Sequence, residues 1–158
     1  MNEELLRDLE EGPDRLAAEI DELTESELVR RPPDGGWNLK ELTGHLRDIE
    51  QFVGIERISM ILEQDNPAVP VFNVEEHARN SSAEHQPIGE TLSEWRNLRE
   101  QTVALLRGLD ADTLRRTGQH PELGELTPVK IAELLVRHDA EHQAQALELK
   151  GMSRAPSS

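Results

Sequence analysis

The chain has 158 residues, no cysteine and a formal net charge of -15. A surface this acidic repels phosphate backbones and anionic lipids, so we expect the protein to bind neither nucleic acid nor membranes. The absence of cysteine excludes a disulfide framework and any thiolate supplied by the protein itself. The acidic start MNEELLRDLEEG lacks an apolar signal core, and no run approaches the roughly 20 apolar residues that span a bilayer. We therefore expect a cytoplasmic protein.

Apolar residues recur at helical spacing from the start of the chain, whereas aromatic residues, which are typical of strands, are scarce. A first helical region is predicted over roughly residues 2–23. Within it, Gly12 and Pro13 predict a kink or a division into two short helices. Thr24 and Glu27 form a predicted capping box that opens a short turn. The segment RPPDGG, residues 31–36, then interrupts the helical pattern.

A second helix is predicted to begin at the N-cap Asn38, with Glu41 completing a capping box, and to run to about Gln64. Its apolar stripe contains His45. Residues 67–89 form a long connection, whose middle, around Val74–Asn80, predicts a short helix. Such a connection either lines a functional site or only crosses the bundle, and the sequence leaves both interpretations open.

The third helix is predicted to begin near Thr91, with Glu94 completing a capping box, and a loop is predicted over residues 113–124. The fourth helix opens with Thr127 and Pro128, the latter at the favoured first helical position. A glycine suited to a helix C-cap ends it at Lys150-Gly151.

Four principal helices predict an all-α protein of the four-helix-bundle class. We expect one domain over residues 1–151 and a flexible polar tail over residues 152–158. Trp37 and Trp95 are expected to pack in the core.

The inward stripe of the fourth predicted helix changes from apolar to polar along its length: Ile131, Leu134, Leu135, His138, His142, Gln145 and Leu149. Burying polar side chains in a row is unfavourable unless each has a partner. His138 and His142 are four residues apart, a spacing that lets two imidazoles bind one ion. The pair alone favours two hydrogen-bonded core histidines instead. HDAEH also lacks the glutamate of the HEXXH motif, which argues against peptide hydrolysis.

His45 adds a third inward-facing imidazole from a second helix. With all three histidines, a metal site and a purely structural interpretation are equally supported by the residues. Three neutral imidazoles would leave a coordination position open for water or a thiol, the pattern of catalytic zinc sites. Zn²⁺ is the first choice of metal, and Ni²⁺ or Fe²⁺ would also accept imidazole ligands.

The candidate catalytic residues are polar groups near these histidines. Asp48, Glu141 and His120 are candidate general bases. Asp48 would alternatively orient a ligand imidazole or lie in solvent, and the same alternatives apply to Glu141. Gln145 would bind a substrate or a bound water, or else make an interhelical hydrogen bond. His120 would line the mouth of a pocket or lie exposed in a loop.

Two further histidines, His77 and His85, lie in the long connection. The sequence gives neither of them a functional role.

Two stretches carry a resemblance to a known family. WNLKELTGHLRDIE, residues 37–50, resembles the pattern of Trp, Glu and His-Leu-x-Asp-x-Glu in the DinB-like family of helical-bundle metalloproteins. RTGQHPELGELTPVKIAELLVRHDAEHQAQ, residues 116–145, resembles its Gly-x-His-Pro-x-x-Gly-x-x-Thr segment followed by His-Asp-x-x-His-x-x-Gln. The resemblance implies that His45, His138 and His142 are metal ligands. It also implies an up-down-down-up bundle with one long crossover between the second and third helices, and a homodimer.

Members of this family resemble thiol S-transferases that use bacillithiol or mycothiol, or a maleylpyruvate isomerase. The family name derives from damage-inducible expression and implies no chemistry on DNA. Three hypotheses follow. The protein is a metal-dependent transferase or hydrolase of a small molecule, such as a low-molecular-weight thiol. Alternatively, it is a non-catalytic bundle that binds a metal or ligand, or is stress-related. The third hypothesis is a plain structural or dimerisation bundle, which the polar inward stripe weakens.

Overall fold

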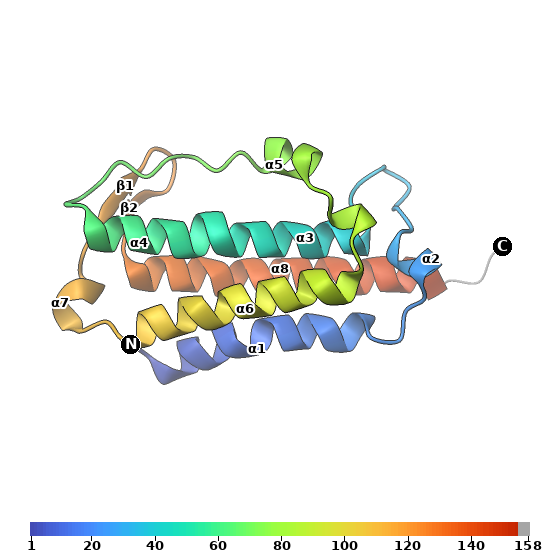
Figure 1. Ribbon diagram of the computed structural model, residues 1–158, viewed down its shortest axis with the longest axis horizontal. Coiled ribbons are helices and arrows are strands. Elements are labelled where there is room, and N and C mark those ends of the chain that lie inside the picture. Colours follow the sequence, from blue (N-terminus) through green and yellow to red (C-terminus); the bar gives the residue numbers. More distant parts are fainter. Residues whose placement is uncertain (155–158) are drawn as a thin grey trace.

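Four long helical rods lie side by side in the computed structural model (Figure 1), which describes residues 1–154. The part of the predicted tail at residues 155–158 lies outside the described residues. The first rod and the last run in one direction and the two middle rods in the other, so the order is up-down-down-up. The long crossover joins the second rod to the third. The predicted all-α four-helix bundle and its topology are confirmed. The rods are α1 (Glu3–Ile20), α3 to α4 (Leu39–Ile49 to Glu56–Glu63), α6 (Ile88–Arg107) and α8 (Pro128–Arg154).

Side chains that cap the helices begin several of these elements at the predicted residues. Capping boxes open both α2 (Glu25–Leu28), at Thr24, and α3, at Asn38. Thr127 Oγ1 accepts a hydrogen bond from the backbone N–H of Lys130 at the start of α8. Each cap provides an acceptor for a backbone N–H that would otherwise lack one.

Two predicted helix ends were wrong. The third rod, α6, begins at Ile88, and its N-cap is Pro87 rather than a residue near Thr91. Thr91 is buried instead, and its hydroxyl donates to Gln86 Oε1. At the other end of the chain, α8 does not stop at Gly151 but continues to Arg154. A helical glycine costs only about 1 kcal/mol relative to alanine, so it does not force an end.

The first rod is one continuous helix, because Gly12 and Pro13 do not divide it. Proline has no N–H to donate to the carbonyl four residues earlier, which here is the carbonyl of Leu9. Nη1 of Arg99, on α6, donates to that oxygen at 2.7 Å. Of the two predicted alternatives, the division into two short helices is wrong, because a neighbouring helix replaces the missing hydrogen bond.

The second rod contains a π-helical segment, η1 (Glu50–Ile55), between α3 and α4. A π turn holds one extra residue, which rotates the side chains that follow it, and such turns are frequent at functional sites. The sequence predicted one regular helix here. The segment begins at Glu50, a fully buried carboxylate.

The crossover lies along the second rod and includes the predicted short helix α5 (Val74–Asn80), followed by the 3₁₀ turn η2 (Ala83–His85). At the other end of the bundle are α7 (Ala111–Leu114) and a small antiparallel hairpin of β1 (Gly118–His120) and β2 (Gly124–Leu126). The hairpin replaces part of the predicted loop. Gly118 pairs with Leu126, and Gly124 has a φ of +76°, a conformation that glycine favours.

The buried apolar residues form two clusters rather than one. One cluster, near the hairpin end, includes Leu9, Ile58 and Leu106, and the other includes Leu16, Leu46 and Trp95. Trp95 thus packs in the core, as predicted. Between the clusters, all four rods contribute to a layer of polar or small residues, which we call the central polar layer: Gly12, His45, Glu50, Arg99, His138, Asp139 and His142.

None of the helices described in residues 1–154 has the length and apolar character needed to cross a membrane.

A candidate metal centre between α3 and α8

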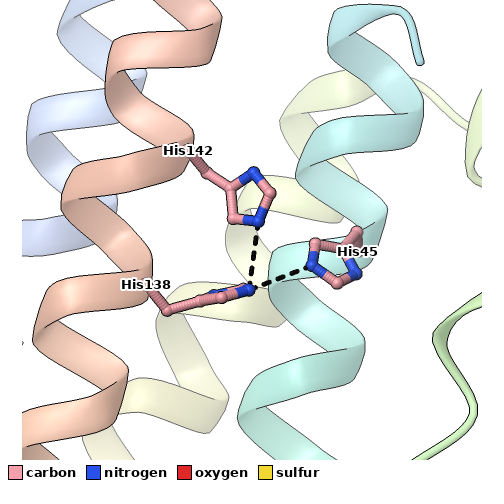
Figure 2. Close-up of side chains that lie close together, drawn as sticks. All are labelled: His45, His138 and His142. Atoms are coloured by element: carbon pink, nitrogen blue, oxygen red, sulfur yellow. Dashed lines mark hydrogen bonds between the residues drawn. The ribbon is translucent and has the colours of Figure 1, made fainter. Parts of the chain in front are cut away.

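Three histidine side chains converge in the central polar layer. His45 projects from α3, whereas His138 and His142 project from successive turns of α8 (Figure 2). The Nε2 atom of His138 lies 3.1 Å from Nε2 of His45 and 3.0 Å from Nε2 of His142. One donor nitrogen from each ring falls within a group whose atoms all lie within 4.8 Å of one another. The fold therefore brings together the three residues that the sequence predicted as ligands.

These short nitrogen–nitrogen contacts fit a cation better than they fit hydrogen bonds. A neutral ring nitrogen offers either one proton or one lone pair, so Nε2 of His138 cannot form a full hydrogen bond to both neighbours. Two imidazoles bound at about 2.0–2.1 Å to a tetrahedral ion have nitrogens about 3.3 Å apart. The separations of 3.0 and 3.1 Å are close to that value. The donor set is therefore compatible with a divalent ion.

Burial keeps the imidazoles of His45 and His138 in the neutral form that binds metals. Burial and the nearby rings of His138 and His142 lower the pKa of His45 to about 3. Burial, the ring of His142 and the guanidinium of Arg99 lower the pKa of His138 to about 4. Near neutral pH, both rings therefore offer an unprotonated nitrogen without first losing a proton.

Gln145 orients one of the three rings. Its Oε1 lies 2.9 Å from Nδ1 of His142, so Nδ1 carries the proton and Nε2 keeps its lone pair for the centre. A carbonyl oxygen in this position fixes the tautomer of a ligand histidine. Gln145 thus contacts a candidate ligand within its own helix, which differs from both roles considered from the sequence.

A cavity of about 240 Å³ opens beside His45. Its walls come from the start of the second rod and from the crossover, and they include Trp37, His45, Asp48, Phe72, His77 and Arg79. The long connection therefore lines this cavity, one of the two alternatives that the sequence left open. The indole of Trp37 packs on His45, with ring centroids 4.6 Å apart. Trp37 is half-buried and packs against the cluster that includes Leu16 and Trp95, so it lies at the edge of the core while its ring also covers His45.

The two carboxylates proposed as bases lie on different sides of the histidines. Asp48 lines the same cavity as His45, and its Oδ1 accepts from Nε of Arg47 at 3.2 Å. Burial raises the pKa of Asp48, although the neighbouring Arg47 opposes this effect. Glu141 is exposed and lines a second, smaller cavity together with His138. Asp48 is therefore the candidate base that shares a cavity with His45, whereas Glu141 is exposed to solvent.

His120 lies in neither position predicted from the sequence. It is buried on β1, and its Nδ1 accepts hydrogen bonds from the backbone N–H groups of Glu122 and Leu123. Its Nε2 lies 3.4 Å from Arg57, and it does not line the cavity beside His45. These bonds close the turn of the hairpin, which the sequence did not predict.

The other two histidines differ from each other. His77 lines the cavity beside His45 and packs on the rings of Phe52 and Phe72. His85 is exposed and lies next to Glu84. The sequence assigned a role to neither, because a histidine in a connection has no periodic neighbours that would reveal its orientation.

A buried ion network supports the histidines from the opposite side. Arg99 is 2% exposed and donates to Oε1 of Glu50 at 2.8 Å and to both oxygens of Asp139 at 2.7 and 2.9 Å. Burial disfavours the charge of Arg99, but the two carboxylates outweigh burial and raise its pKa. One guanidinium thus joins two carboxyl groups, from the second rod and from α8, next to the candidate centre. The sequence analysis missed this network; Arg99 and Asp139 at inward helical positions were the available signal.

Comparisons with known proteins agree with this geometry. A provisionally named metal-dependent hydrolase of Halalkalibacterium halodurans is 34% identical over 110 residues, which cover 70% of this chain and 63% of that protein, less than two thirds of its length. Another protein with that provisional name, from Oceanobacillus iheyensis, is 25% identical over 141 residues, covering 89% of this chain and 80% of that protein.

A solved structure has the same fold. YfiT from Bacillus subtilis, a probable metal-dependent hydrolase with an unusual four-helix bundle topology, superposes with a TM-score of 0.84 at 25% sequence identity. The match covers 94% of this chain and 87% of YfiT. A family model for the DinB superfamily matches residues 8–146, which include all three histidines. The resemblance carried by the two motifs is confirmed: the chain belongs to the DinB superfamily.

Proposed function

We propose that this protein is a metal-dependent hydrolase of a small molecule, with His45, His138 and His142 as the metal ligands and Zn²⁺ as the metal. The observation that carries the proposal is the convergence of three Nε2 atoms, one from α3 and two from α8. The names of the similar proteins support hydrolysis as the reaction. When bound by three neutral imidazoles, such an ion retains an open coordination position and lowers the pKa of a water molecule there.

The residues of the cavity have separate tasks in this proposal. Asp48 accepts a proton from the attacking water and returns it to the leaving group, a role that suits a carboxylate with a raised pKa. Trp37 and Phe72 provide apolar walls that exclude solvent and position the substrate. The volume of about 240 Å³ limits the substrate to a small molecule.

Transfer to a low-molecular-weight thiol is a second candidate function. The chain contains no cysteine, so a thiol nucleophile would have to enter the cavity as a second substrate. The same three histidines would serve this reaction, with the thiol taking the place of water.

Elemental analysis and a substrate panel test these proposals together. We expect the purified protein to hold about one divalent ion per chain and both His45→Ala and His142→Ala to lose it. The metal-loaded protein should hydrolyse esters, amides or lactones, and turnover should vanish in His142→Ala. Turnover of electrophiles only with an added thiol would favour the transferase instead. Stoichiometric metal without turnover in either panel would indicate a binding protein, and full metal content in His45→Ala would remove His45 from the site.

A further inference from the structure

Two buried polar atoms beside the histidines lack hydrogen-bond partners. Among the described residues, Oε2 of Glu50 and Nδ1 of His138 belong to the few buried side-chain atoms without one. An unpaired buried polar group costs about 1–3 kcal/mol, so each requires an explanation. The two atoms are chemically complementary. A carboxylate oxygen accepts, and Nδ1 of His138 must carry a proton whenever its Nε2 lone pair binds a metal.

Arg99 links Glu50 to the turn of α8 that carries His138. Nε of Arg99 donates to Oε1 of Glu50, while its two terminal nitrogens bind Asp139, the residue directly after His138. Gly54 supports the same placement. A Cβ atom on Gly54 would lie 3.3 Å from Cδ1 of Leu135 and 3.8 Å from the carboxyl carbon of Glu50. Leu135 lies one turn before His138 on α8.

One histidine of the site already has a side-chain acceptor for its outer ring nitrogen. Nδ1 of His142 has a side-chain acceptor in Gln145, whereas Nδ1 of His138 has none. Ligand histidines commonly donate their outer N–H to a carboxylate or carbonyl oxygen, which fixes the ring and strengthens the ligand. Glu50 is the buried carboxylate with an oxygen to spare, because Arg99 occupies only Oε1.

We propose that Glu50 is the positioning residue of His138. When Nε2 of His138 binds the metal, Oε2 of Glu50 accepts the proton of Nδ1, and Arg99 holds the carboxylate in place through Oε1. This inference rests on the proposed metal centre. The proposal also assigns a role to the π-helical segment, because Glu50 is the first residue of η1 and is fully buried among the rods.

The test compares zinc affinity in two variants that change the same charge. Glu50→Gln removes one carboxylate of the Arg99 network and leaves a single acceptor oxygen where Arg99 and His138 need two. Asp139→Asn removes the other carboxylate and leaves the acceptor. By competition with a chromophoric chelator at pH 7.5, Glu50→Gln should bind zinc about 10- to 100-fold more weakly than the wild type. Asp139→Asn should differ from the wild type by less than about threefold, because it leaves the proposed hydrogen bond between Glu50 and His138 in place.

The outcomes separate the possible failures. Equal loss in both variants would mean that the network acts only through folding or charge, and wild-type affinity in Glu50→Gln would also overturn the inference. If the wild type itself binds no zinc, the proposed function fails first. Should Glu50→Gln not fold, ¹⁵N NMR of the zinc-loaded wild type decides. A proton on Nδ1 of His138 that exchanges slowly with water is expected, because Glu50 would hold it in a hydrogen bond, and a proton that exchanges rapidly would refute the assignment.

Discussion

At the scale of single residues, the proposed metal ligands, which are the three histidines, are distinct from the proposed general base, which is Asp48. Asp48 lies in the cavity of His45 without being one of the three ligands. We expect Asp48→Asn to retain its full metal content and to lose about 10²- to 10⁴-fold in kcat on whichever substrate the panel identifies. The acid limb of the pH–rate profile should disappear with it. Unchanged turnover would exclude Asp48 as the base, and lost metal would make it a structural residue.

Gly12 has no side chain, and this leaves room for the ion pair of Arg99 and Asp139. A Cβ atom there would lie 2.3 Å from Oδ2 of Asp139 and 2.9 Å from Nη1 of Arg99. We expect Gly12→Ala to destabilise the protein by about 2–4 kcal/mol, because it separates a buried ion pair. Gly151 is a helical glycine with open space around it, so Gly151→Ala should be neutral or stabilising by up to about 1 kcal/mol. Urea unfolding measures both, and equal effects would contradict the steric argument.

At the scale of elements, α5 is held over the cavity by aromatic contacts. Phe72 stacks on Phe52 of η1 with ring centroids 5.7 Å apart, and His77 of α5 packs on both rings. We expect Phe52→Ala to release α5, so that its amides exchange at least about tenfold faster, while those of α3 keep their protection. Hydrogen exchange measures this. Val71→Ala, an exposed neighbour in the crossover, is the control. Equal exchange in α5 of the wild type and Phe52→Ala would mean that other contacts hold it.

The elements that could be predicted from the sequence are those fixed by local chemistry. Asn38 and Glu41 cap α3 whatever packs around them, and the i, i+4 spacing of His138 and His142 places both on one face. Features that depend on a distant partner could not be predicted. Pro13 predicts a kink or a break in the first helix. The helix continues because Arg99, on another helix, donates a hydrogen bond to the carbonyl of Leu9. The π turn and the position of Trp37 likewise follow from tertiary packing rather than from periodicity.

At the scale of the whole molecule, the central polar layer divides the apolar core into two clusters. All four rods contribute to the layer, so its stability is part of the stability of the fold. A buried charge network contributes little by itself, because desolvation offsets most of the Coulomb attraction. A ligand that binds only the folded state adds RT ln(1 + [L]/Kd), about 2.7 kcal/mol at 100 times Kd. We therefore infer that metal binding and folding are coupled.

The pH dependence of folding tests whether the folded protein keeps two of the candidate ligands neutral. The pKa values of His45 and His138 lie at about 3 and about 4 in the folded protein, below the ordinary value of 6.5. Between these values and 6.5, the unfolded chain binds protons that the folded chain does not, so stability falls as pH falls. From pH 7.5 to 5, chelator-treated protein should lose on the order of 2 kcal/mol for each histidine in urea unfolding. The double variant His45→Gln/His138→Gln should lose much less over this range. If its stability falls as steeply as that of the wild type, titration of these two rings does not cause the pH dependence of folding.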